Sequence, residues 1–285
     1  MAQGYLCVTF DFDALSAWVA RDIVSPTPLS RGEFAAVAVP RLLDLLRRRD
    51  VPATWFVPAH TATTYPGLCR EIVAAGHEIA LHGYAHENVA LLDAPTERDL
   101  LARSFDVVSE VTGIEPTGFR APSWDLSAQS VELMVAQGLR YDSSLMGHDH
   151  TPYLCRTPDL VDEDGVTWGA QTPLVELPVS WTLDDFPHLE FLRSGGAVLP
   201  GLRDPAEMFG NWRRDLDWML RELHQGVLTV TCHPEVIGRG HRLLALEDWL
   251  DGVLDCDVEP VTADRVVQQF TGGATFARPR VLPAP

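Results

Sequence analysis

Two acidic residues near the start of the chain and two histidines farther along have the types and spacing that metal-assisted hydrolysis uses. Asp11 and Asp13 end the first apolar run, and His82 and His86 lie four residues apart in a later one. Two imidazoles and one carboxylate can hold a divalent metal ion and leave a coordination position for water. A second carboxylate beside them could take a proton from that water. These residues therefore predict a metal-assisted hydrolase.

The spacing of the two aspartates bears on whether they belong to a metal site. Asp11 and Asp13 alternate with Phe12, so their side chains share one face of a continuing strand. Carboxylates on one face repel each other unless a cation separates them, which favours a metal site over a charged loop at a strand end. In that interpretation Asp13 binds the ion and Asp11 is the general base. The histidine pair alone is less specific, because one surface histidine and one packed histidine would give the same spacing. Gly83, directly after His82, permits a tight turn between the two histidines.

Three further residues could support the reaction. Arg120 follows a strand-like run and could hydrogen-bond Asp11 and keep it ionised, or form a purely structural salt bridge. His233 ends another apolar run, where it could be structural or could protonate a departing amine near neutral pH. Asp142 is a candidate partner to orient His233.

Strand-like and helix-like segments alternate along the chain, which predicts a parallel sheet covered by helices, either open or closed into a barrel. The predicted strands are 5–10, 53–57, 78–81, 117–120, 174–179 and 227–232. The predicted helices are 40–49, 68–75, 96–111, 127–138, 206–225, 243–254 and 263–270, the first with Pro40 in its opening turn. The candidate residues follow strands, and ligands bind at the carboxyl ends of strands in both kinds of sheet.

No linker or change of composition interrupts residues 1–285, so a single domain is expected. Residues 146–172 lack a clear period and are expected to form a long loop beside the site. The tail after Gly273 is expected to be extended.

The composition describes an acidic protein with enough apolar residues for a large core. Of its 285 residues, 46% are hydrophobic and 22% are charged, and the formal net charge is −18. This charge argues against binding of nucleic acid or of an anionic membrane surface. The five cysteines show no CxxC spacing or disulfide framework, and no basic leader or bilayer-length apolar stretch is visible. A reduced, cytoplasmic setting is expected.

Five short motifs resemble the polysaccharide deacetylase superfamily, which is defined by the NodB homology domain, and they occur in that family's order. They are Thr9–Asp13, His82–His86, Arg120–Trp124, Tyr141–Ser144 and Cys232–Pro234. The resemblance implies an α/β fold, a distorted (β/α) barrel with about seven parallel strands, and hydrolysis of a carbon–nitrogen bond other than a peptide bond. It also implies that Asp13, His82 and His86 hold a divalent metal, predicted here to be zinc. Asp11 would be the base, His233 the acid and Arg120 the tether of the base.

The chain departs from the common form of the first motif, in which two adjacent aspartates are followed by glycine. Here Phe12 separates the aspartates and Ala14 follows. With the segments 181–187 and 237–242, this spacing resembles a branch of cytoplasmic peptidoglycan deacetylase-like proteins and metal-independent allantoinases. Three alternatives therefore stand beside the metal-dependent hydrolase: a metal-independent, allantoinase-like amidohydrolase, a non-haem iron oxygenase with the same ligand types, and a non-catalytic carbohydrate-binding module.

The substrate-binding residues are predicted from their positions. Trp181, Asp184 and Asp185 follow the strand at 174–179, so they should reach the rim of the site, where Trp124 would add a second aromatic wall. A pocket enclosed by indoles suits a compact molecule, whereas a polymer needs an open groove; tryptophans packed in the core would leave the site open. The expected partner is a small amide, imide or N-acetylated sugar, with neither nucleic acid nor membrane. Self-association into a homo-oligomer is left open.

Overall fold

The computed structural model describes residues 3–191, 193–194, 197–198, 201–273 and 276. Its centre is a curled sheet with the strand order β12-β1-β2-β3-β4-β5-β9-β6, and β13 pairs with the start of β1. The strands from β12 to β9 in this order run parallel, whereas β6 is antiparallel to β9. This confirms the predicted distorted (β/α) barrel with about seven parallel strands. The strands of this sheet are β1 (Gly4–Asp11), β2 (Ala53–Val57), β3 (Glu78–Leu81), β4 (Gly118–Phe119), β5 (Tyr141–Asp142), β6 (Tyr153–Arg156), β9 (Gln171–Glu176), β12 (Gly226–Cys232) and β13 (Val258–Pro260).

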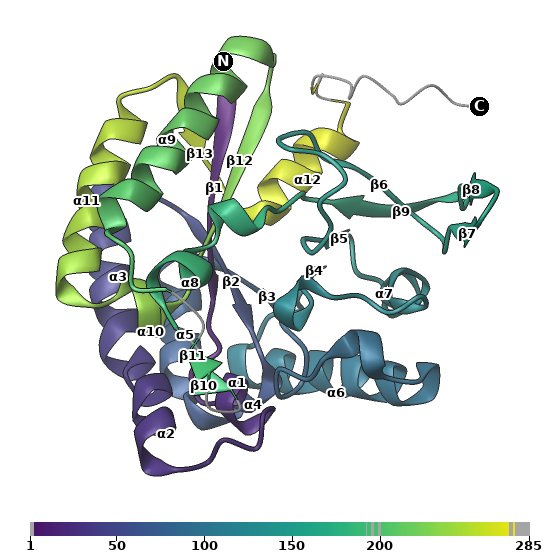
Figure 1. The fold of residues 1–285 in the computed structure, drawn as a ribbon, viewed down its shortest axis with the longest axis horizontal. Helices are drawn as coiled ribbons and strands as arrows, with labels where there is room; N and C mark the ends of the chain where they lie inside the picture. The colour runs from purple at the N-terminus through teal and green to yellow at the C-terminus, as the bar shows by residue number, and fades with distance from the viewer. Residues whose placement is uncertain (1–2, 192, 195–196, 199–200, 274–275, 277–285) are drawn as a thin grey trace.

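Helices cover the outside of the curled sheet and one of its ends (Figure 1). α9 packs against β12, α11 packs against α9 and α3, and α5 packs against β3 and α6. The helices are α1 (Ser16–Val19), α2 (Pro26–Glu33), α3 (Ala35–Arg49), α4 (Ala59–Thr64), α5 (Pro66–Ala74), α6 (Ala94–Thr112), α7 (Ser130–Gln137), α8 (Asp185–Leu189), α9 (Pro205–Glu222), α10 (Pro234–Ile237), α11 (Gly240–Leu254) and α12 (Ala263–Thr271). Within the described part of the chain, no helix is both long enough and apolar enough to cross a bilayer.

α12 closes the end of the sheet at which the strands begin. The backbone N–H of Ala263 donates to Thr54 Oγ1 at 2.8 Å, and that of Asp264 donates to Glu78 Oε2 at 3.0 Å. Thr54 and Glu78 stand at the amino ends of β2 and β3, so α12 lies across that end. The carboxyl ends of the strands face the other way, where a site can form.

The alternation of side chains along β1 determines which residues face the inside of the curl. The outward positions, which pack between the sheet and the helices, are Leu6, Val8 and Phe10. Tyr5 and Cys7 belong to a second cluster, which includes residues of α12. Asp11 shares the face of Tyr5 and Cys7, because strand side chains alternate with a period of two. Asp11 therefore points into the curl at the carboxyl end of β1.

The structure differs from the sequence-based expectations in three places. Pro40 lies inside α3 on its exposed side rather than in the first turn, because the helix begins at Ala35. Residues 146–172 are not one loop: they include β6, the start of β9 and a hairpin that projects from the body in Figure 1. This hairpin consists of β7 (Leu160–Asp162) and β8 (Gly165–Thr167). The short helices α1, α2, α4, α8 and α10 were not predicted. Apart from Phe276, the tail after Gly273 lies outside the described residues.

Two buried carboxyl groups face each other across β5 and β9. Asp142 and Glu176 are register partners, and both are fully buried. Glu176 Oε1 accepts the backbone N–H of Ser144 at 2.9 Å and that of Leu145 at 3.0 Å. Burial raises the pKa of Asp142 to about 6, and burial together with the charge of Asp142 raises the pKa of Glu176 well above its usual range. The pair therefore retains a proton in the folded state near neutral pH.

This retained proton predicts that stability falls as the pH rises. Both folded pKa values lie above the unfolded values of about 4. The stabilising contribution is therefore complete below about pH 4 and is lost as the pH rises through about 6 and beyond. Glu176→Gln substitutes an isosteric neutral amide for the carboxyl group. Over this pH range the free energy of unfolding should therefore fall by roughly 1 to 3 kcal/mol less in the variant than in the wild type. Urea unfolding of metal-free wild type and variant across this pH range measures the effect, and equal slopes would contradict a retained proton.

Candidate metal centre and active site

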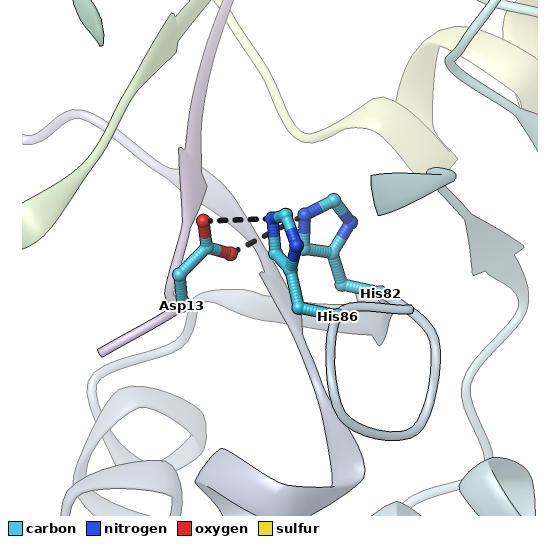
Figure 2. A group of neighbouring side chains, drawn as sticks. All are labelled: Asp13, His82 and His86. Atoms are coloured by element: carbon cyan, nitrogen blue, oxygen red, sulfur yellow. Dashed lines mark ion pairs between the residues drawn. The ribbon is translucent and has the colours of Figure 1, made fainter. Parts of the chain in front are cut away.

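Asp13, His82 and His86 converge at the carboxyl end of the sheet. Figure 2 shows the Asp13 carboxylate facing both imidazoles, with Oδ1 3.3 Å from His82 Nε2 and Oδ2 3.1 Å from His86 Nε2. One potential ligand atom from each residue lies within 4.8 Å of those from the other two, and all three residues are buried. The convergence expected from the sequence is present.

The donor set fits a divalent metal ion. His82 Nδ1 lies 2.7 Å from the backbone carbonyl oxygen of Arg120, so Nδ1 carries the proton and Nε2 presents its lone pair toward Asp13. Asp13 Oδ1 is buried and has no hydrogen-bond partner among the described residues. Burial opposes ionisation of Asp13, but the imidazoles of His86 and His82 outweigh it and hold the pKa of Asp13 well below its usual range. An ionised carboxylate with an unused oxygen and two imidazoles are suitable zinc ligands.

The turn that carries both histidines is closed by Glu87. His86 has φ +63° and Gly83 has φ +69°, and this left-handed region is unfavourable for a non-glycine residue such as His86. The Glu87 carboxylate accepts the backbone N–H of Tyr84 at 2.8 Å and that of Ala85 at 2.7 Å. These two bonds fix the turn and offset the cost of the His86 backbone conformation. Glu87 therefore positions His86, a candidate metal ligand.

Glu87→Ala is expected to weaken zinc binding by about 10- to 100-fold, because the turn that aims His86 loses both of its hydrogen bonds. Competition with a chromophoric chelator measures the affinity without an assay of turnover. Glu110→Ala, at an exposed position of α6, is the matched control and should bind zinc like the wild type. Unchanged affinity in the Glu87 variant would show that the loop holds its shape without it.

Arg120 makes the predicted contact with Asp11. Arg120 Nη1 donates to Asp11 Oδ1 at 2.7 Å, and the arginine is fully buried. Nη1 also lies within hydrogen-bond distance of Thr9 Oγ1 and Thr231 Oγ1, while Nη2 donates to Ser143 Oγ and Nε to the carbonyl oxygen of Ser143. Asp11 Oδ2 lies 3.8 Å from His82 Nε2, so this second oxygen faces the metal centre. Arg120 therefore acts behind Asp11 as a positioning residue.

His233 reaches the same centre from the end of β12. Its Nε2 lies 3.8 Å from Asp13 Oδ2, while its Nδ1 lies 2.8 Å from Asp185 Oδ1. Asp185 also accepts the backbone N–H of His233, at 3.0 and 3.1 Å from its two oxygens. The expectation that Asp142 orients His233 is wrong, because Asp142 is paired with Glu176 and Asp185 takes that place.

The charges around His233 favour its protonated form. Burial alone would lower the pKa of His233, but the carboxylates of Asp184 and Asp185 outweigh it and raise that pKa well above its usual range. Burial likewise raises the pKa of Asp184 to about 7. His233, Asp184 and Asp185 form a second group of potential metal ligands. Because Asp185 already accepts the Nδ1–H and the backbone N–H of His233, we interpret this group as an oriented acid whose Nε2–H faces the centre.

A cavity of about 190 Å³ joins these residues. Its lining includes Asp11, Asp13, His82, His86 and His233, together with Trp124, Trp181 and Asp184. The two indoles stack on each other with ring centroids 4.4 Å apart, so they form one continuous wall rather than the two walls expected. Trp181 is 45% exposed at the mouth, whereas Trp124 is buried.

Asp185 does not have the predicted position at the rim. It is fully buried behind His233, so the expected substrate contact is replaced by a positioning role. A parallel bridge between Asp184 and Thr231 brings this segment beside the end of β12. Asp184 does line the cavity, and its Oδ1 accepts the backbone N–H of Phe186 at 2.9 Å.

Several residues of the site were not predicted from the sequence. They are Ala17, Arg21, Ser123, Phe186 and Pro187, which line the cavity, and the hydroxyl residues around Arg120. Thr9 and Thr231 could have been found, since each lies two residues before Asp11 or His233 on the same strand face. The others lie on loops or very short helices, which have no period to detect.

The curled parallel sheet and the residues at its carboxyl end are those of a hydrolase of (β/α)-barrel type with a candidate metal centre. The family model for polysaccharide deacetylase matches residues 29–141. A peptidoglycan deacetylase of Helicobacter pylori is 37% identical over 275 residues, which cover 91% of this chain and 94% of that protein. A crystal structure assigned as a polysaccharide deacetylase from Mycobacterium smegmatis is 35% identical with a TM-score of 0.84, covering 100% of this chain and 95% of that one.

The chain belongs to the polysaccharide deacetylase family and is a hydrolase acting on carbon–nitrogen bonds other than peptide bonds. An allantoinase structure, 20% identical with a TM-score of 0.78 and covering 96% of this chain and 92% of that one, has the same fold. Membership of this family argues against the oxygenase considered from the sequence. The meeting of Asp11, His233 and the candidate ligand trio at one cavity argues against the non-catalytic module.

Proposed function

We propose that this protein hydrolyses the acyl–nitrogen bond of a small substrate, either an N-acetylated amino sugar or a compact cyclic amide, with one zinc ion held by Asp13, His82 and His86. The observation that carries the proposal is the meeting of three kinds of group at one cavity. The ligand trio, the carboxylate of Asp11 and the imidazole of His233 all line it.

In the proposed reaction, Asp11 acts as the base and His233 acts as the acid, on opposite sides of the scissile bond. When bound, zinc supplies polarisation of the substrate carbonyl and acidifies water. Asp11, held by Arg120 through Oδ1, accepts a proton from the attacking water through Oδ2. The water oxygen bonds to the carbonyl carbon, and the carbon–nitrogen bond breaks as His233 gives its Nε2 proton to the departing nitrogen. The products are a carboxylate and an amine, joined in one molecule if the substrate was a ring.

The size of the cavity supports a small substrate. A volume of about 190 Å³ holds a monosaccharide-sized or smaller molecule. The stacked indoles of Trp124 and Trp181 give it one flat apolar wall, which suits a ring. A glycan chain would need an open groove on both sides of the reacting sugar. The cytoplasmic setting remains a prediction, which subcellular fractionation tests.

Turnover on a panel of substrates tests the proposal. The panel contains N-acetylated monosaccharides, hydantoin-type cyclic amides and chitin oligomers, each assayed with zinc and after treatment with a chelator. We expect turnover of a small amide that is lost on chelation and restored by zinc. Faster turnover of chitin oligomers than of every small amide would contradict the small substrate. Turnover that survives complete removal of metal would favour the allantoinase-like, metal-independent alternative.

A further inference from the structure

Arg21 is the one arginine or lysine among the described residues that line the active-site cavity. It follows α1, and its Nη1 donates to the carbonyl oxygen of Ala17, one helical turn earlier, at 2.5 Å. α1 is in turn fixed to the metal centre, because Ser16 donates to the carbonyl oxygen of Asp13 through its backbone N–H at 3.0 Å and its Oγ at 2.7 Å. Arg21 therefore has a defined place relative to Asp13.

The guanidinium of Arg21 is available to a ligand. Arg21 is exposed, so it stands at the mouth of the cavity, and it forms no salt bridge within the described part of the chain. Arg31, in α2, differs, since it pairs with Glu190 at 2.9 Å and lies over the ring of Trp18. One Nη group of Arg21 is used by Ala17, and no other described residue accepts a hydrogen bond from the rest of the planar fork, which can therefore donate to a ligand.

Any anionic ligand of Arg21 has to bind to a protein with a large negative net charge. The net charge of −18 would repel an anion at long range, but at physiological ionic strength such repulsion is screened beyond about 8 Å. At contact distance the guanidinium of Arg21 can still pair with an anionic group at the mouth, although Asp11, Asp13 and Asp184 line the same cavity. It matches the geometry and the single charge of a carboxylate, whereas the second charge of a phosphate would remain unpaired.

We propose that the substrate carries a carboxylate group, which Arg21 binds at the mouth of the cavity while the scissile amide lies between Asp11 and His233. This inference rests on the proposed function and narrows its substrate class to acidic amides. Arg21 then determines specificity and takes no part in the bond-breaking step.

Matched pairs of compounds test the inference. N-acetylmuramic acid is compared with its lactyl carboxamide, and hydantoin-5-acetic acid with its carboxamide, so each pair differs by one charge and little in shape. In the zinc-loaded wild type, kcat/KM should be higher for the acidic member. Arg21→Gln should lower kcat/KM for the acids about tenfold more than for the neutral amides, mainly through KM. Arg21→Lys should lie between, because it keeps the charge and loses the fork.

The controls separate this inference from the proposed function. Arg98→Gln, at an exposed position of α6, changes the net charge equally and should affect neither member of a pair. Calorimetric binding of the four compounds to the metal-free protein provides a readout without turnover. Wild type should bind the acids more tightly, and Arg21→Gln should bind acid and amide alike. Equal binding of acid and amide by the wild type, or equal losses for both in the variant, would overturn the role of Arg21. Absence of turnover on every substrate, with the binding preference intact, would instead count against the proposed function.

Discussion

Replacing Asp11 by Asn should lower kcat by roughly 10² to 10⁴-fold, while zinc binding stays close to that of the wild type. The amide cannot accept the proton of the attacking water, whereas the ligand atoms belong to Asp13, His82 and His86. Steady-state rates on the best small amide of the panel measure the first effect. Metal analysis of the purified variant measures the second.

This variant needs a stability control, because Asp11→Asn removes the negative charge that pairs with the buried Arg120. An unpaired buried charge costs about 3 to 5 kcal/mol, so the unfolding midpoint must be measured and the assay run well below it. A folded, zinc-loaded Asp11→Asn protein with wild-type turnover would remove Asp11 from the mechanism. Loss of zinc together with turnover would instead place Asp11 among the ligands.

His233→Ala should reduce amide hydrolysis by about 10² to 10⁴-fold, because an amine leaves poorly without a proton. The loss should shrink strongly on a nitrophenyl acetate ester, since a nitrophenolate departs without protonation. Comparing the two substrates in one variant measures the dependence on the leaving group. This ratio is independent of how much active enzyme the preparation contains.

Two matched variants sharpen the test of His233. Asp11→Asn should slow both substrates to a similar degree, because both need an activated water. Asp185→Asn should show a weaker form of the His233→Ala pattern, since it removes the carboxylate that orients and charges the imidazole. An equal loss on amide and ester in His233→Ala would contradict its role as the acid.

The parallel α/β architecture was predictable because strands and amphipathic helices differ in period along most of the chain. β2 (Ala53–Val57) and β3 (Glu78–Leu81) coincide with the predicted ranges. The helices of four to six residues, α1, α4, α8 and α10, were missed, since they are too short to show a helical repeat. The segment 146–172 was misjudged for a related reason: β7 and β8 have three residues each, which is too short to show a strand period, and all six are exposed.

The candidate site was predictable wherever a residue directly follows a strand. His82 follows β3, Arg120 follows β4 and His233 follows β12, so the carboxyl ends of the strands gather them. The partner of His233 could not be predicted, because Asp185 reaches it from 48 residues away through a bridge at Asp184. Nothing in the local sequence distinguishes Asp185 from Asp142 in this role. Arg21 was missed because it lies on an irregular segment after a four-residue helix.

Arg120 serves the site through two separate parts of one residue. Its side chain holds Asp11, and its backbone carbonyl oxygen fixes the tautomer of His82. A side-chain substitution at this position removes only the first function, because every amino acid supplies the same carbonyl. In evolutionary terms, a single substitution of Arg120 is therefore enough to turn an enzyme into a protein that still binds metal but no longer catalyses hydrolysis. Descendants of such a mutant would retain the histidine motif. The motif alone therefore indicates common descent but does not show that a protein is catalytically active.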